Sequence, residues 1–225
     1  MGNTAYTSQY GVLSGATLTI ESVIANNLYH GRTDSDGADN VALFLAYLTS
    51  LSDDMTSAWN EEQVYGRQDP IGTFQNTTRK ISIGFDIPAK NLGAAKANLN
   101  DINKVKQFMY PAYSSSTTPA SGSNPEVTTN ALSLAKSPLV RLKFANLIQN
   151  HEGKGLLGWL NSFSANPVIE MGMFNEGTLN EAKFYPKVYN ATLTFTPQHE
   201  FDLGFKSPDG LAIDTASFPS FPYGG

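Results

Sequence analysis

The residue types that most often carry out chemistry are few in this sequence, and their spacing does not suit it. Two histidines precede glutamates, His151-Glu152 and His199-Glu200, which is how a zinc-hydrolase motif begins. Neither pair is followed by a histidine at the HExxH spacing, so this metal-binding pattern is absent. The third histidine is His30, and a zinc site or a catalytic triad would need most of the three together. We therefore predict no metal site and no catalytic residues.

Other catalytic patterns also fail on geometry. Glu61-Glu62 offers two carboxylates, but neighbouring residues of an extended segment point in opposite directions and would not face one glycosidic bond. The glycines around Lys154 lack the spacing and the Ser/Thr of a phosphate-binding loop, which predicts a turn. The chain contains no cysteine, which excludes disulfides, thiolate zinc sites and cysteine nucleophiles. These patterns predict a protein that is not an enzyme and that holds no cofactor.

The densest segment in functional side chains is residues 59–87, where two arginines lie near aromatic and acidic residues. A guanidinium can fork to a carboxylate and stack on a ring. Such a group either anchors a subunit interface or clamps its own turn, and the sequence leaves both alternatives open. The predicted interface residues are Tyr65, Arg67, Asp69, Phe74 and Arg79, with Asp86 as a second nearby carboxylate.

Composition points to a protein that is covered by neighbours or to a β-rich domain with uncharged loops. Charged residues make up 16% of the 225 residues, against an average of about 25%. The net charge of −5 argues against a protein that grips nucleic acid by neutralising phosphates, but is compatible with one that nucleic acid slides past. The chain opens with no signal-peptide pattern, and we expect assembly in a reducing cytoplasm.

The elements that must position these residues follow from hydrophobic periodicity in the first half of the chain. A strand is expected over residues 16–24, and helical spacing of apolar residues predicts a short helix over 40–51. Residues 79–87 alternate, with isoleucines and Phe85 on one face, which predicts a half-buried strand that Pro88 ends. Apolar residues at three- and four-residue spacing predict a helix over 91–109.

The second half of the chain is rich in predicted strands. A Ser/Thr/Pro/Gly segment at 114–125 is expected to be a loop without a core. Strands are predicted over 139–144, 155–163, 167–174 and 188–196, and the tail after Phe201 is expected to lie extended on another surface. The sum is an α+β fold that is mainly β. We divide the chain into an N-terminal segment (1–58) that is irregular apart from the short helix and packs on neighbours, a main domain (59–200) and a C-terminal tail (201–225).

The order of several short motifs resembles a family of tailed-bacteriophage baseplate proteins, the tail tube initiator or hub-ring proteins. The similarity covers roughly residues 59–200, and it depends on the order and spacing of the motifs, since each one alone is weak. The motifs are VYGRQDPI at 64–71, FQNTTR at 74–79, YPAY at 110–113, PLVR at 138–141, FANLI at 144–148, GLLG at 155–158 and YPK at 185–187.

The resemblance implies a tail-tube-like β-sandwich or barrel with a flanking helix. Six copies would form a ring around a channel, through which DNA passes without specific binding. The expected role is a structural virion protein of the tail baseplate that links the central hub to the tail tube and initiates tube assembly. Its expected partners are copies of itself, the tail tube protein and other hub proteins, with no membrane insertion.

Two kinds of alternative stay open. One is a ring at the other end of the tail, a terminator or connector. The other is a cell-wall hydrolase or peptidoglycan-binding module of the baseplate, which would need a paired-carboxylate cleft or a glycan groove.

Overall fold

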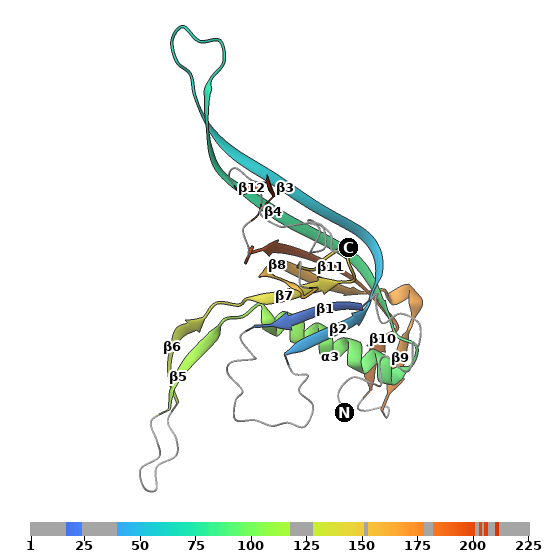
Figure 1. The fold of residues 1–225 in the computed structure, drawn as a ribbon. Coiled ribbons are helices and arrows are strands. Elements are labelled where there is room, and N and C mark those ends of the chain that lie inside the picture. Colours follow the sequence, from blue (N-terminus) through green and yellow to red (C-terminus); the bar gives the residue numbers. More distant parts are fainter. Residues whose placement is uncertain are drawn as a thin grey trace.

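The protein is mainly β. The computed structural model describes residues 17–23, 40–117, 128–150, 153–177, 182–200, 203, 205–206 and 210–211, and within them holds one α-helix. Figure 1 shows one large sheet, from which a long hairpin projects, while the remaining strands form separate two-stranded sheets. The elements are β1 (Thr17–Ser22), β2 (Val41–Leu45), β3 (Tyr47–Glu62), β4 (Ile71–Pro88), α3 (Leu92–Phe108), β5 (Ala112–Thr117), β6 (Thr128–Lys136), β7 (Val140–Phe144), β8 (Leu156–Pro167), η1 (Ile169–Met171), β9 (Met173–Glu176), β10 (Lys183–Pro186), β11 (Val188–Pro197), β12 (Phe205–Lys206) and β13 (Gly210–Leu211).

The main sheet is antiparallel and curled. Its seven strands run in the order β2-β1-β7-β8-β11-β4-β3, so three adjacent strands from the second half of the chain lie between two pairs from the first half. Phe44 of β2 meets Phe85 of β4 with ring centroids 6.0 Å apart, although three other strands and β11 separate β2 from β4 along the sheet. The curl therefore encloses the apolar face and brings the two ends of the sheet toward each other.

The core fills the inside of this curl. Alternate residues of β4 and β11 point into it, and Ile81, Phe85 and Phe195 are completely buried. Helix α3 packs mainly against β2 and contributes Ile102 and Val105 to the same cluster. Burial of these side chains is the main force that holds the sheet in its curled form.

The opposite face of the central strands is polar but carries few charges. Asn190 of β11 donates to the Asp86 carboxylate of β4 at 2.7 Å, and the hydroxyls of Ser164 and Thr192 lie 2.7 Å apart. The paired residues Ser82 and Thr194 continue this row. Hydroxyl and amide groups thus form a hydrogen-bonded polar surface on this side of the sheet.

Helix α3 begins at a strong cap and carries a buried acid. The Asn91 side chain accepts a hydrogen bond from the backbone N–H of Ala94 at 2.8 Å, which satisfies one of the free donors of the first turn. Asp101 faces β2, where it accepts a hydrogen bond from the Leu43 N–H, and lies 3.6 Å from Lys104. Burial raises the pKa of Asp101 to about 6, although Lys104 and Leu43 act in the opposite direction. Asp101 thus satisfies a backbone N–H of the edge strand β2, and this N–H is no longer available to pair with another chain.

Most of the strands and the long helix are confirmed. The strands predicted at 16–24, 79–87, 139–144, 155–163 and 188–196 correspond to β1, β4, β7, β8 and β11, and the helix predicted at 91–109 is α3. Pro88 ends β4 as expected. The mainly β, α+β fold class is therefore confirmed.

The predicted helix over residues 40–51 is wrong. This segment forms β2 and the start of β3, separated by Ala46. Its apolar run fits helical spacing, but Ala42, Phe44 and Ala46 are buried alternately, as a strand requires. Pairing with β1 and β4 decides the outcome, because an apolar run of this length suits either structure. Residues before position 59 thus join the same sheet as the strands that follow.

Two further segments differ from expectation. Residues 114–117, predicted as loop, lie in β5 and pair with β6, whereas 118–125 lie outside the described residues. Residues 167–174 do not form one strand: the turn η1 interrupts them, and Gly172 adopts a φ of 81° before β9 begins. Of the tail after Phe201, only positions in or near β12 and β13 are described.

Candidate interaction surface: the β3–β4 arm

The outer part of the β3–β4 hairpin, residues 54–78, projects from the sheet, and we call it the arm (Figure 1). Strand β11 pairs with β4 only from Ile81 to Pro88, whereas β3 pairs with β4 from Asp86 out to Ile71. The strands of the arm therefore pair only with each other. Among the described residues no second layer covers either face of the arm, and Ile71 and every later residue of β4 as far as Thr78 are exposed.

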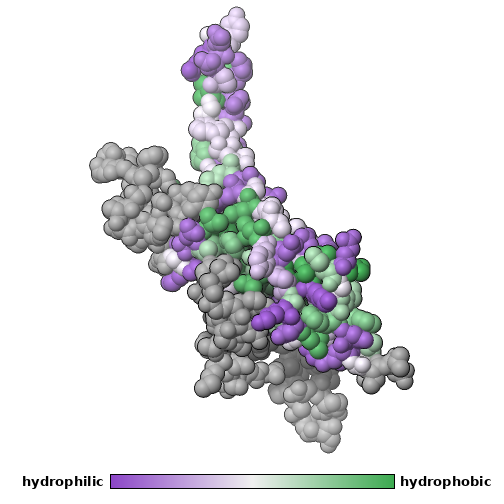
Figure 2. All heavy atoms as spheres, turned by 90° about the vertical axis from the view of Figure 1, so that its right-hand side faces the viewer, coloured by the Kyte–Doolittle hydropathy of each residue, from purple (hydrophilic) through white to green (hydrophobic). Residues whose placement is uncertain are grey.

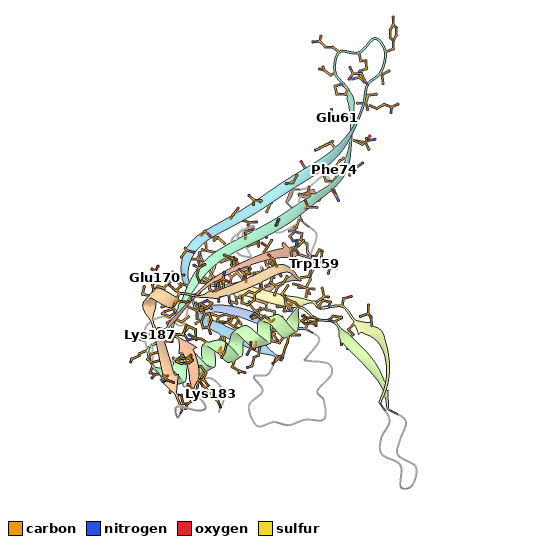
Figure 3. All side chains as sticks on the ribbon, turned by 180° about the vertical axis from the view of Figure 1, so that it is seen from behind. Glu61, Phe74, Trp159, Glu170, Lys183 and Lys187 are labelled. Atoms are coloured by element: carbon orange, nitrogen blue, oxygen red, sulfur yellow. The ribbon has the colours of Figure 1, made fainter. Side chains whose placement is uncertain are left out.

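Aromatic side chains lie on the arm in open solvent. Trp59 and Phe74 are cross-strand partners whose rings meet edge to face at 5.3 Å. They remain 56% and 51% exposed, although each is large enough to be a core residue. Gly72 lies beside the indole, where an added Cβ would make an ordinary van der Waals contact with the Trp59 ring at 3.5 Å. Figure 3 places Phe74 midway along the arm and Glu61 closer to its tip.

A buried ion pair marks the point where the arm leaves the sheet. Arg79 of β4 forks to Asp53 of β3, with Nε to Oδ1 at 2.8 Å and Nη2 to Oδ2 at 2.5 Å. Both side chains are almost completely buried. His199 lies near the pair, and its pKa is lowered by partial removal from water and by the positive charge of Arg79. Charge is thus neutralised within the chain at the base of the arm.

The predicted interface residues lie at three places along the hairpin. Tyr65, Arg67 and Asp69 lie together in the exposed turn at the tip, where the Arg67 N–H bonds the Val64 carbonyl at 3.2 Å and Gly66 has a φ of 86°. Phe74 lies on the shaft of the arm and Arg79 at its base. The contact of these residues with a neighbouring subunit stays a prediction.

The partner of Arg79 differs from the nearby acids that its sequence context suggested. Its carboxylate comes from Asp53, 26 positions earlier in the chain, whereas Asp86 accepts from Asn190. The guanidinium of Arg79 therefore makes an intramolecular contact within the hairpin, while its predicted contact with a neighbouring subunit stays a prediction. Asp53 and Trp59 are the residues that sequence reasoning missed, and the register of the long hairpin was the signal required to find them.

The arm is acidic. Between positions 54 and 78 it carries Asp54, Glu61, Glu62 and Asp69 against Arg67 alone. Glu61 and Glu62 are consecutive strand residues, so they point to opposite faces, as predicted. The arm therefore presents apolar rings together with negative charge.

The described residues offer little that could carry out chemistry. No group of three or more potential metal ligands occurs among them, and no helix in this part of the chain is long and apolar enough to cross a membrane. Glu200, beside His199, binds Arg141 at 2.7 and 2.9 Å. Gly153 lies in a turn, as predicted, with a φ of 74°. His30 and His151-Glu152 lie outside the described residues.

Neither the models of known protein families nor the curated proteins include a match to this chain.

Proposed function

We propose that this protein is a structural subunit of a phage tail baseplate, where copies of it form a ring that joins the central hub to the tail tube and initiates tube assembly. The single observation that carries the proposal is the arm, a two-stranded ribbon that displays Trp59 and Phe74 to solvent. The phage context comes from the resemblance of the motifs between residues 59 and 200 to baseplate ring proteins.

A ribbon of this kind gains stability from a partner. A two-stranded hairpin without a covering layer is at best marginally stable in water. Its outer edges also present unpaired backbone groups, which favour pairing with another chain. A neighbouring protein would remove Trp59 and Phe74 from water and satisfy these edges, so an assembled state suits the arm better than an isolated chain.

The polar face of the main sheet supports the same role. Hydroxyl and amide groups line it around Thr192 and Asn190, and the chain as a whole is acidic at −5. A channel wall for DNA should attract phosphates weakly, and a surface of this kind does so because it lacks a concentrated basic patch. DNA would then pass the ring without adhering to it.

The test is to mix the purified protein with tail tube subunits and follow tube formation by electron microscopy and light scattering. We expect six-fold rings and tubes that start from them, while tube subunits alone assemble slowly. Rings without tube initiation would argue for the terminator or connector at the other end of the tail, and labelling of this protein in intact virions would locate it. Failure to form rings and to initiate tubes would contradict the proposal.

A further inference from the structure

A second exposed apolar surface lies far from the arm, at the corner built by η1, β9 and β10. We call residues 169–176 and 183–187 the corner. Its large apolar side chains are exposed by 38–70%: Ile169, Met171, Met173 and Phe184. Figure 2 views the molecule from this side and shows hydrophobic side chains among hydrophilic ones there. Methionine side chains are flexible and polarisable, which suits a contact surface.

The corner, taken together with the lysines beside it, is basic where the arm is acidic. Lys183 and Lys187 belong to it, and Lys90 lies alongside because the Ala89 N–H bonds the Lys187 carbonyl at 2.7 Å. Of its two acids, Glu176 is neutralised by Lys96 of α3 at 2.5 Å. The other is Glu170. Lysines therefore set the charge around the apolar side chains of the corner.

The corner is also held in a fixed shape. Lys96 ties β9 to α3 through Glu176 and lies 5.6 Å from the centre of the Tyr185 ring, while Lys187 lies 5.5 Å from that of Phe174. The Val168 N–H bonds the Val188 carbonyl at 3.0 Å, which fixes the start of the turn to β11. A surface ordered in this way before binding loses less conformational entropy on association.

The arm and the corner cannot meet within one chain. Figure 3 shows Glu61 and Phe74 on the arm, and Lys183 and Lys187 at the opposite end of the molecule. Every copy carries one surface of each kind: the arm, which is apolar and acidic, and the corner, which is apolar and basic. A contact between them joins two different patches, so it is heterologous and can propagate around a ring.

We propose that the arm of one copy docks on the corner of the next, with Trp59 and Phe74 against the apolar side chains around Phe184 and with Glu61 facing Lys183. The proposal specifies which surfaces would join neighbouring subunits, and it rests on the proposed ring assembly. Its occupant is a second copy of this chain because the two surfaces complement each other in charge and in apolar character.

The chain has no cysteine, so engineered thiols report the contact directly. Thr77 pairs with Ser57 on the face of the arm that carries Trp59, whereas its neighbour Thr78 pairs with Thr56 on the other face. Asn175 is exposed opposite Phe184 on the corner. We would mix Thr77→Cys with Asn175→Cys under mild oxidation and expect a disulfide between the two variants. The matched mixture of Thr78→Cys with Asn175→Cys should cross-link far less.

Charge reversal provides the second measurement. Glu61→Lys should weaken self-association, measured by analytical ultracentrifugation, by about two- to fivefold, as expected for an exposed ion pair. Lys183→Glu should do the same, and the double variant should recover most of the loss. Trp59→Ala, which removes a large ring from the contact, should weaken association by about tenfold or more.

The outcomes separate this inference from the proposed function. Cross-linking of Thr77→Cys with itself, oligomers without the arm–corner disulfide, or a chain that stays monomeric would each overturn the docking. Tube initiation is scored separately with unmodified protein and tube subunits. An arm–corner disulfide in particles that never initiate tubes would uphold the docking and contradict the baseplate role.

Discussion

The inner and outer parts of the β3–β4 hairpin are built from the same two strands but lie in different surroundings. Phe85 in the inner part is completely buried, whereas Phe74 in the outer part is 51% exposed. The inner part of β4 pairs with β11 as well as β3, and the core covers one of its faces. The outer part pairs with β3 alone. The same residue type therefore serves folding in one part and is available for association in the other.

Composition follows this division. Between Arg79 and Pro88 an apolar residue occupies every second position of β4, as a half-buried strand requires. Between Ile71 and Thr78 most residues are Thr, Asn, Gln or Gly, which suit a ribbon with water on both faces. The Arg79–Asp53 pair lies at the boundary. We expect substitutions on its inner side to change folding and those on its outer side to change assembly.

The largest effect should come from Phe85→Ala. The substitution removes a fully buried ring that packs on Phe44, so it loses apolar burial and leaves a cavity. We expect the free energy of unfolding, measured by denaturant titration, to fall by about 3–5 kcal/mol. A loss below about 1 kcal/mol would mean that the inner part of the hairpin is not part of the core.

Loss of the boundary ion pair should have the next largest effect. Asp53→Ala leaves the Arg79 guanidinium buried without its carboxylate, which should lower the free energy of unfolding by about 3 kcal/mol. Asp54→Ala, one position along on the exposed side of the strand, is the control and should change it by less than about 0.5 kcal/mol. Equal effects of the two substitutions would contradict the boundary that we infer at the Arg79–Asp53 pair.

The buried acid on α3 should make stability depend on pH. Burial raises the pKa of Asp101 from 3.8 to about 6, so the folded state binds this proton more tightly than the unfolded state does. Stability from this group is therefore complete below about pH 4 and is lost as the pH rises through about 6, by about 3 kcal/mol in all.

Asp101→Asn should abolish that loss, measured as the difference between wild type and variant in unfolding titrations at several pH values. The difference isolates Asp101 from His199, whose lowered pKa acts in the opposite direction: its contribution is present above the unfolded pKa of 6.5 and is lost as the pH falls below that value through the lowered pKa of the folded state. An unchanged pH dependence in Asp101→Asn would show that the acid is not buried against β2.

The smallest effect on folding should come from Phe74→Ala. Half of this ring is already in water, so we expect the free energy of unfolding of the single chain to fall by less than about 1 kcal/mol. Self-association of the same variant should be clearly weaker if the arm is an interface. A stability loss equal to that of Phe85→Ala would show that the arm is packed in the isolated chain.

The sequence by itself determined the elements whose periodicity has only one interpretation. The alternation around Ile83 in β4 and around Leu193 in β11 predicts strands with one buried face, and both are found. The long apolar stripe of α3 and the end of this helix before Pro111 could be predicted in the same way. These patterns extend over enough residues that local spacing and tertiary packing agree.

Tertiary structure decided what depends on partners distant in the chain. The apolar run at 41–48 suits a helix or a strand, and pairing with β1 and β4 makes it two strands. The partner of Arg79 is Asp53 because the hairpin register places them on one face, which no local motif records. Long-range pairing also sets the length of the arm. Strand β11 pairs with β4 only from Ile81 to Pro88, whereas the β3–β4 pairing continues past that point and carries Trp59 and Phe74 into solvent. Periodicity indicates which side of a helix or strand is buried, but only the fold determines which residues pack against that side.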